Sequence, residues 1–156
     1  MAPILATAYD AVAQQAAMVE CHYESSWNGP LAEALLTSRD LDVRRGVTTV
    51  GPHRDEIHVT LAGAPARTHA SQGEQRSLAL ALRLAADGVI RTVGVAEPVL
   101  LLDDVFSELD PNRAGALLEA LPEGQRILTT AAGLPSAARP DQVIRVHDSA
   151  LTLESP

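Results

Sequence analysis

The sequence predicts an α/β domain with a largely parallel sheet. Three features indicate this fold class: a continuous apolar run at Val99–Leu102, a strongly helical pattern before it, and a further helix and strand after it. Four consecutive apolar residues are typical of a strand that is buried on both faces, as parallel strands are. Alternation of helices with such strands is typical of α/β domains, whose ligands bind at the carboxyl ends of the strands.

The composition is that of a globular protein. The chain has 156 residues, of which 46% are hydrophobic and 21% are charged, which corresponds to about one domain. No apolar run approaches the ~20 residues that cross a bilayer, and the first residues lack the basic region of a secretory signal. A single cysteine, Cys21, excludes an internal disulfide and a multi-cysteine zinc site. We therefore expect a cytoplasmic protein with no membrane partner.

The charge pattern excludes one nucleotide-binding motif. The chain carries 20 acidic and 12 basic residues and a net charge of −8, and every basic residue is an arginine. This net negative charge argues against a protein that binds a polyanion over most of its surface. Such binding would be limited to a local patch of arginines. A Walker A loop requires a lysine for the β- and γ-phosphates. This chain therefore contains no Walker A loop.

The first 45 residues are expected to be helical. Residues 3–20 are rich in alanine and predict a helix that extends toward Tyr23. A second short helix is expected at Leu31–Ser38, followed by a polar loop at Asp40–Gly46. We expect residues 1–45 to belong to a separate lobe or arm, and residues 46–156 to form the α/β part.

The remaining elements follow from periodicity. Apolar and polar residues alternate over Glu56–Leu61, which predicts a half-buried strand. From Glu74 to Val89 the pattern is helical, with Leu78, Leu82, Ala85 and Ala86 on one stripe that Leu80 and Leu84 widen. Asp110-Pro111 begins another helix as N-cap and first residue. Further strands are expected at residues 126–130, 142–147 and 151–153.

The strongest candidate for chemistry is the acidic pair Asp103-Asp104 at the end of the apolar strand. One carboxylate can hold Mg²⁺ through water, and the next can orient or deprotonate a water that attacks a phosphoryl group. An apolar strand that ends in such an acidic pair is typical of a Walker B motif. The alternative is an ordinary core strand followed by a polar loop.

Three further segments are candidates. Ser71 and Gly73 precede a long helix whose backbone N–H groups suit a phosphate, although Ser71 with Glu74 is also a plain capping box. Ser107–Asp110 is either a functional loop or a loop that ends in an N-cap. Thr129-Thr130 ends a strand, where two hydroxyls either contact a phosphate or a water, or are ordinary strand threonines.

The order of these segments is that of the second half of an ABC-type ATPase: signature, Walker B, D-loop. Together with Gly51-Pro52-His53-Arg54-Asp55 and Ser71-Gln72-Gly73-Glu74-Gln75, the sequence resembles the C-terminal part of the RecF family, which is related to the SMC-like ATPases. The resemblance covers roughly residues 31–147. Transporter-type ATPases carry Leu-Ser-Gly-Gly-Gln instead, and usually a histidine where Thr129-Thr130 stands.

The resemblance implies an ATP- and Mg²⁺-dependent dimer. RecF-like ATPases dimerise head to head with ATP between the subunits. Asp103 would order Mg²⁺ and Asp104 would orient or activate water. The signature residues that would meet the nucleotide of the other subunit are Ser71, Gln72, Gly73 and Gln75.

The same resemblance implies roles for two further pairs of residues. Ser107 and Asp110 would form the D-loop across the dimer, and Thr129 or Thr130 would occupy the switch position. Because the signature and the phosphate loop of one ATP site lie on different subunits, ATP would favour the dimer.

The biological role implied by the resemblance is recombinational DNA repair and replication restart, within the SOS response. The expected partners are double-stranded, gapped or junction DNA, a second copy of the chain, and the mediator proteins RecO and RecR, with recombinase loading at gaps as the outcome. His53 and Arg54 could reach DNA phosphate or nucleotide, or could brace the junction between lobes.

The missing Walker A loop predicts that the chain is the C-terminal half of such an ATPase and has little or no ATPase activity alone. Two alternatives remain open. One is a truncated, non-catalytic interaction module, and the other is half of another SMC-like ATPase.

Overall fold

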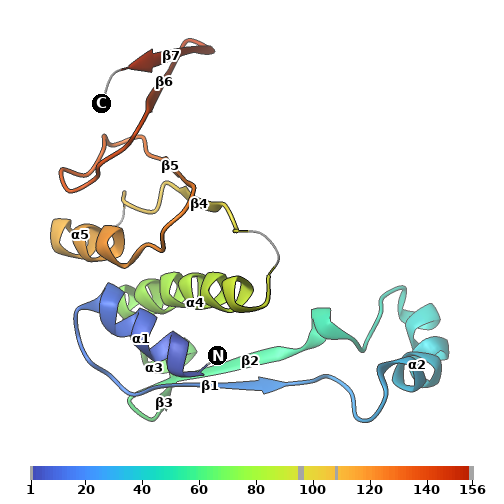
Figure 1. Cartoon of the computed structure of the whole chain (residues 1–156). Helices are drawn as coiled ribbons and strands as arrows, with labels where there is room; N and C mark the ends of the chain where they lie inside the picture. Colours follow the sequence, from blue (N-terminus) through green and yellow to red (C-terminus); the bar gives the residue numbers. More distant parts are fainter. Residues whose placement is uncertain (1, 95–96, 108, 155–156) are drawn as a thin grey trace.

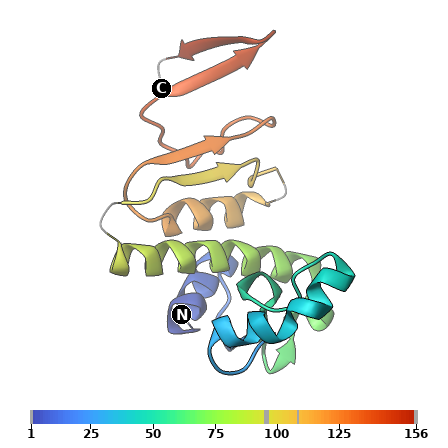
Figure 2. The same ribbon diagram turned by 90° about the vertical axis from the view of Figure 1, so that its right-hand side faces the viewer.

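A computed structural model describes residues 2–94, 97–107 and 109–154. The long helix α4 (Gln72–Val93) crosses the middle of the molecule, and α1 (Ala2–Ala13) packs against both α4 and α5 (Pro111–Ala120) (Figure 1). The turned view shows the same stack of layers, with the strands of the C-terminal half beyond α5 (Figure 2).

The C-terminal strands form two pairs. β4 (Leu100–Asp103) and β5 (Arg126–Thr129) are parallel, and their register places Asp103 opposite Thr129. This pair, covered by helices on one side, confirms the α/β class with a parallel sheet. β6 (Val143–His147) and β7 (Ala150–Glu154) form an antiparallel hairpin. Its two-residue turn, Asp148-Ser149, has φ of 47° and 62°, as a type I′ turn requires.

The N-terminal helix is shorter than the alanine content predicts. α1 ends at Ala13, Gln14 adopts φ 51°, and residues 19–24 form strand β1 (Val19–Glu24), so the helix predicted over residues 3–20 is wrong beyond Ala13. β1 pairs antiparallel with β2 (Glu56–Leu61), the strand predicted at those residues, and β2 also pairs with β3 (Ala64–Pro65). β1 itself alternates apolar and polar residues, which favours a strand.

Helix α2 (Leu31–Arg45) lies at the end of the β1–β2 hairpin, which extends away from the stack (Figure 1). The predicted end at Ser38 and the predicted loop over Asp40–Gly46 are wrong. The helix continues to Gly46, which adopts φ 67° and donates its N–H to the carbonyl of Asp42. α2, described in full, buries none of its residues, so its polar second half is an exposed helix rather than a loop.

Two hydrophobic cores lie on opposite sides of α4. The first packs α1, α4, the three-stranded sheet and the short helix α3 (Ala66–His69); its buried residues are Leu5, Tyr9, Val19, Leu61, Ala66, Leu78, Ala81 and Ala85. The second packs the end of α1, α5 and β4 together; its buried residues are Val12, Leu102, Phe106, Ala114, Leu117 and Leu121. Leu80 and Leu84 of α4 pack on the second core and not on the first, so they form a second apolar face of α4 and the predicted widening of a single stripe is wrong.

Residues on both sides of position 45 share these cores. α1 packs along α4 and β1 pairs with β2, while α2 lies apart at the end of the hairpin. The division into residues 1–45 and 46–156 stays a prediction. Among the described helices, none is long and apolar enough to cross a membrane.

Candidate nucleotide site at the strand ends

The carboxyl ends of β4 and β5 are joined by one threonine side chain. The Thr129 hydroxyl donates a hydrogen bond to Oδ1 of Asp103 and accepts one from the Asp104 backbone N–H at 3.1 Å. The same N–H also lies 3.1 Å from the Thr129 carbonyl oxygen. Both aspartates are exposed. The parallel register therefore brings Asp103, Asp104 and Thr129 to one edge of the strands.

Asp104 turns the chain out of the strand. Its φ of 49° lies in the left-handed region, where a residue other than glycine is disfavoured by about 1 kcal/mol or more. Bonds to both backbone groups offset this cost: Thr129 accepts from its N–H, and the Ser107 hydroxyl donates to its carbonyl at 2.9 Å. The backbone of Asp104 is thus held in a turn directly after the strand.

The acidic pair fits Mg²⁺ only in combination with other ligands. Within the described residues, no group of three or more histidine, cysteine, aspartate or glutamate side chains could hold a metal ion. Mg²⁺ is typically bound by one or two carboxylates together with waters and substrate phosphates. Asp103, with its oxygen ligands at an exposed edge, suits that mode.

The segment after Asp104 leads into α5 through an N-cap. Oδ1 of Asp110 accepts the N–H groups of Asn112 at 3.0 Å and Arg113 at 3.1 Å, which confirms the predicted cap. Oδ2 of Asp110 lies 3.5 Å from Nε of Arg113. Ser107 bonds Asp104, whereas Glu108, within the same motif, lies outside the described residues. This loop therefore connects the acidic pair to the start of α5.

The signature segment forms the start of α4. Ser71 and Glu74 make a capping box: the Glu74 N–H donates to Ser71 Oγ at 3.3 Å, and the Ser71 N–H donates to Glu74 Oε2 at 2.7 Å. Hydrogen bonds from Ser71, with a smaller contribution from the Arg113 charge, lower the pKa of Glu74. The Gln75 amide donates to the Ala70 carbonyl at 2.9 Å, and Gln72 is exposed.

The segment predicted as the D-loop and the segment predicted as the signature meet at Arg113. A Cβ atom built on Gly73 would lie 2.6 Å from an Nη atom of Arg113. The sequence contained no signal for this contact, because Arg113 is one of several isolated arginines and its partner is 40 positions away along the chain. Figures 1 and 2 show the two helices that carry these residues lying side by side.

The remaining predicted residues lie elsewhere. Thr130 bonds within its own turn, donating to the Gly133 carbonyl at 3.2 Å. His53 and Arg54 belong to the short 3-10 helix η1 (Pro52–Arg54), which joins α2 to β2 at the end of the hairpin. That end of the hairpin lies far from β4 and β5 (Figure 1). Both contact the Thr48 carbonyl, His53 Nε2 at 3.3 Å and Arg54 Nε at 2.9 Å. These contacts are of the kind that braces a chain junction.

The neighbouring Gly51 and Asp55 are also bonded to the turn after β1. Ser26 Oγ accepts the Gly51 N–H at 3.0 Å, and the Ser26 N–H donates to Asp55 Oδ1 at 2.9 Å. The Tyr23 hydroxyl donates to Asp55 Oδ2. This motif therefore holds the two strands of the hairpin together where they approach α2.

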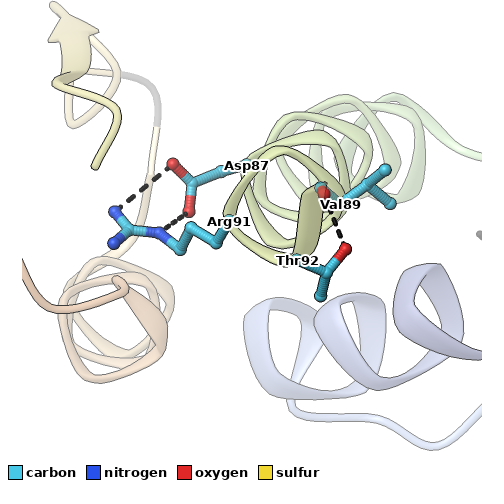
Figure 3. A network of polar contacts seen from close by, with 4 residues as sticks. All are labelled: Asp87, Val89, Arg91 and Thr92. Carbon is cyan, nitrogen blue, oxygen red and sulfur yellow. Dashed lines mark hydrogen bonds and ion pairs between the residues drawn. The ribbon is translucent and has the colours of Figure 1, made fainter. Parts of the chain in front are cut away.

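A second polar group lies in a groove of about 370 Å³ between α1, α4 and the end of α5. Asp87 is only 6% exposed and accepts from Nε of Arg91 at 2.6 Å (Figure 3). A Cβ on Gly124 would lie 3.5 Å from an Nη atom of Arg91. This ion pair lies within α4, and the Arg91 guanidinium lies beside the turn after α5.

Comparison with known proteins assigns the chain to a family. It is 43% identical to the DNA replication and repair protein RecF of Frankia alni, over 83% of this chain and 38% of the relative. The chain belongs to the RecF family. It matches the C-terminal part of RecF proteins and spans less than half the length of the relatives described here. A scan against models of protein families gave no match.

Two solved RecF structures support this assignment. A structure of the recombination mediator protein RecF-ATPrS matches 97% of this chain and 43% of its own, at 27% identity and a TM-score of 0.67. A structure of RecF-ATP matches 98% of this chain and 43% of its own, at 25% identity and a TM-score of 0.65. The ABC-type ATPase architecture expected from the sequence is thereby confirmed.

Proposed function

We propose that this chain acts as the C-terminal portion of a RecF-like ATPase in DNA repair and replication in the cytoplasm. The observation that carries the proposal is the arrangement of Asp103, Asp104 and Thr129 at the carboxyl ends of two parallel strands, in a chain 43% identical to a RecF protein. Ligands of open α/β sheets bind at this edge.

ATP with Mg²⁺ is the proposed nucleotide. Both solved RecF structures carry ATP or ATPrS in their names. Asp103 would hold the metal together with the nucleotide phosphates, and Asp104 would orient the attacking water. Bound Mg²⁺ would neutralise charge that develops on the transferred phosphoryl group. The start of α4, with Ser71 and Gly73, would face the nucleotide of a second subunit.

A Walker A segment would be supplied by the part of a RecF protein that this chain does not span. One face of the β4–β5 pair supports this: Leu101 is 68% exposed and Ile127 is 48% exposed, while Leu102 is buried against α5. Parallel strands are usually covered on both faces. We infer that the Walker A segment packs on Leu101 and Ile127.

Contact with DNA would be local, because the chain has a net charge of −8. Head-to-head dimerisation on gapped or junction DNA, cooperation with RecO and RecR, and recombinase loading within the SOS response all belong to this proposal. His53 and Arg54 would act at the junction of the arm rather than on the nucleotide, since their bonds go to Thr48.

The test is a chimera in which this chain replaces the matched C-terminal part of the Frankia alni relative. We expect Mg²⁺-dependent ATP hydrolysis that Asp104→Asn reduces at least a hundredfold. Ser71→Arg should abolish ATP-driven dimerisation, whereas Ser136→Arg, in an exposed loop, should not. An inactive chimera that still folds would favour the non-catalytic interaction module. Robust turnover by the 156-residue chain alone would contradict the proposal.

A further inference from the structure

Arg113 lies where three helices meet. Its Nε atom is 3.5 Å from Oδ2 of Asp110, at the start of α5. An Nη atom lies against Gly73, in the first turn of α4. Its charge also acts on Glu74 of α4 and on the buried Tyr9 of α1. The side chain is 36% exposed, so it is partly enclosed by these neighbours.

Backbone conformation does not explain why residue 73 is glycine. Gly73 is helical and is absent from the positive-φ glycines, which include Gly46 and Gly51. A helical glycine is less favourable than alanine by roughly 1 kcal/mol. The space that a Cβ would fill is instead occupied by the Arg113 guanidinium, at 2.6 Å. Any larger residue at position 73 must displace that guanidinium.

Displacing Arg113 would also change its contact with Asp110. One carboxylate oxygen of Asp110 caps α5, and the other faces Arg113. The guanidinium therefore touches the D-loop end of α5 and the signature end of α4 at once. A movement of either segment changes the space available to Arg113, and through it the other segment.

From this geometry we infer that Arg113 is a positioning residue that couples the D-loop Asp110 to the signature turn, and that a side chain at position 73 would disturb this coupling. The contacts of Arg113 with Gly73 and Asp110 are observed in the structure. The part that they play in ATP-driven dimerisation rests on the proposed function.

The test is a double-mutant cycle of Gly73→Ala and Arg113→Gln. In the chimera, each single variant should weaken ATP-driven dimerisation about tenfold, and the double variant should be no weaker than either. Gly115→Ala is the matched control, because its Cβ would meet none of the described residues within 4 Å. If the double variant weakens dimerisation about a hundredfold, the two losses are independent and the coupling is overturned. Single variants that dimerise as well as Gly115→Ala would overturn it too.

A second readout needs no nucleotide. In the 156-residue chain, NMR titration should show that both single variants raise the pKa of Glu74, because both move the Arg113 charge away from it. An unchanged Glu74 pKa in Gly73→Ala would overturn the inferred contact. A raised pKa in a chain whose chimera is inactive would retain the contact while rejecting the ATPase. Arg113→Lys, which keeps the charge, should shift the Glu74 pKa less than Arg113→Gln does.

Discussion

The hydroxyl of Thr129, at the end of β5, donates a hydrogen bond to Oδ1 of Asp103, at the end of the neighbouring parallel strand. The same oxygen accepts the Asp104 N–H at 3.1 Å. One side chain thus fixes the carboxylate of the first aspartate and the backbone turn of the second. Of the two threonines proposed for the switch position, Thr129 bonds to both members of the acidic pair, and Thr130 bonds within its own turn.

Replacing Thr129 with valine should separate this positioning role from packing. Valine has a similar shape but lacks the hydroxyl, so Asp103 loses a donor and the Asp104 N–H loses an acceptor. We expect a loss of about 1 kcal/mol in unfolding free energy and at least a tenfold loss of ATP hydrolysis in the chimera. Thr129→Ser should retain most activity. Equal activity of Thr129→Val and Thr130→Val would contradict the assignment.

Stability should depend on pH through Glu74. Its folded-state pKa lies below the ordinary value of 4.5, chiefly because of hydrogen bonds with Ser71. The stabilisation is therefore fully present above pH 4.5 and is lost as the pH falls through the lowered folded-state pKa. Urea unfolding between pH 3 and pH 7 measures it. Glu74→Gln preserves the capping pattern without the charge and should flatten this part of the profile.

Ser71→Ala tests the same cap from the other side. Losing the N-cap should cost about 1 kcal/mol of unfolding free energy and should return the pKa of Glu74 toward its ordinary value. The loss should shrink at acid pH, where Glu74 is protonated. A pH-independent loss would show that the Glu74 carboxylate contributes nothing to the capping box.

Local patterns were sufficient to predict the elements around the acidic pair. The apolar run before Asp103, the helical stripe of α4 and the Asp110-Pro111 start each depend on residues close in sequence. β1 was missed because its alternation follows an alanine-rich helix, and its strand conformation depends on pairing with β2, far along the chain.

The contacts among the candidate residues could not be predicted from the sequence. Asp103 and Thr129 are 26 residues apart, and only the parallel register of β4 and β5 brings them together. Arg113 was missed altogether, because its importance comes from the close approach of α5 to Gly73. Sequence order suggests the motifs, but tertiary packing decides which side chains contact one another.

The buried ion pair of α4 should be worth more than an exposed one. Asp87→Ala would remove the 2.6 Å partner of Arg91 and leave Glu97 as the acidic neighbour of its guanidinium. We expect a loss of about 2 kcal/mol in unfolding free energy, measured with urea. Glu154→Ala, which breaks the exposed pair with Arg145, is the control and should change stability little. Equal effects of the two variants would rule out a structural role for Asp87.

The uncovered face of β4 allows a test in which one substitution should change this chain little and should destabilise the chimera. Leu101 is 68% exposed in this chain, so Leu101→Glu should leave its stability nearly unchanged and should reduce self-association. In the chimera, the Walker A segment is expected to cover this position, and the same substitution would place a charge in a packed interface. We therefore expect a chimera that unfolds more easily and loses ATP hydrolysis.

Leu134→Glu is the matched control, because Leu134 is 45% exposed in a loop. It should be tolerated in both the chain and the chimera. If Leu101→Glu is equally harmless in both, the face of β4 stays uncovered in the larger protein. The Walker A segment would then have to lie elsewhere, and the acidic pair would lack the phosphate-binding loop that an ATPase of this kind requires.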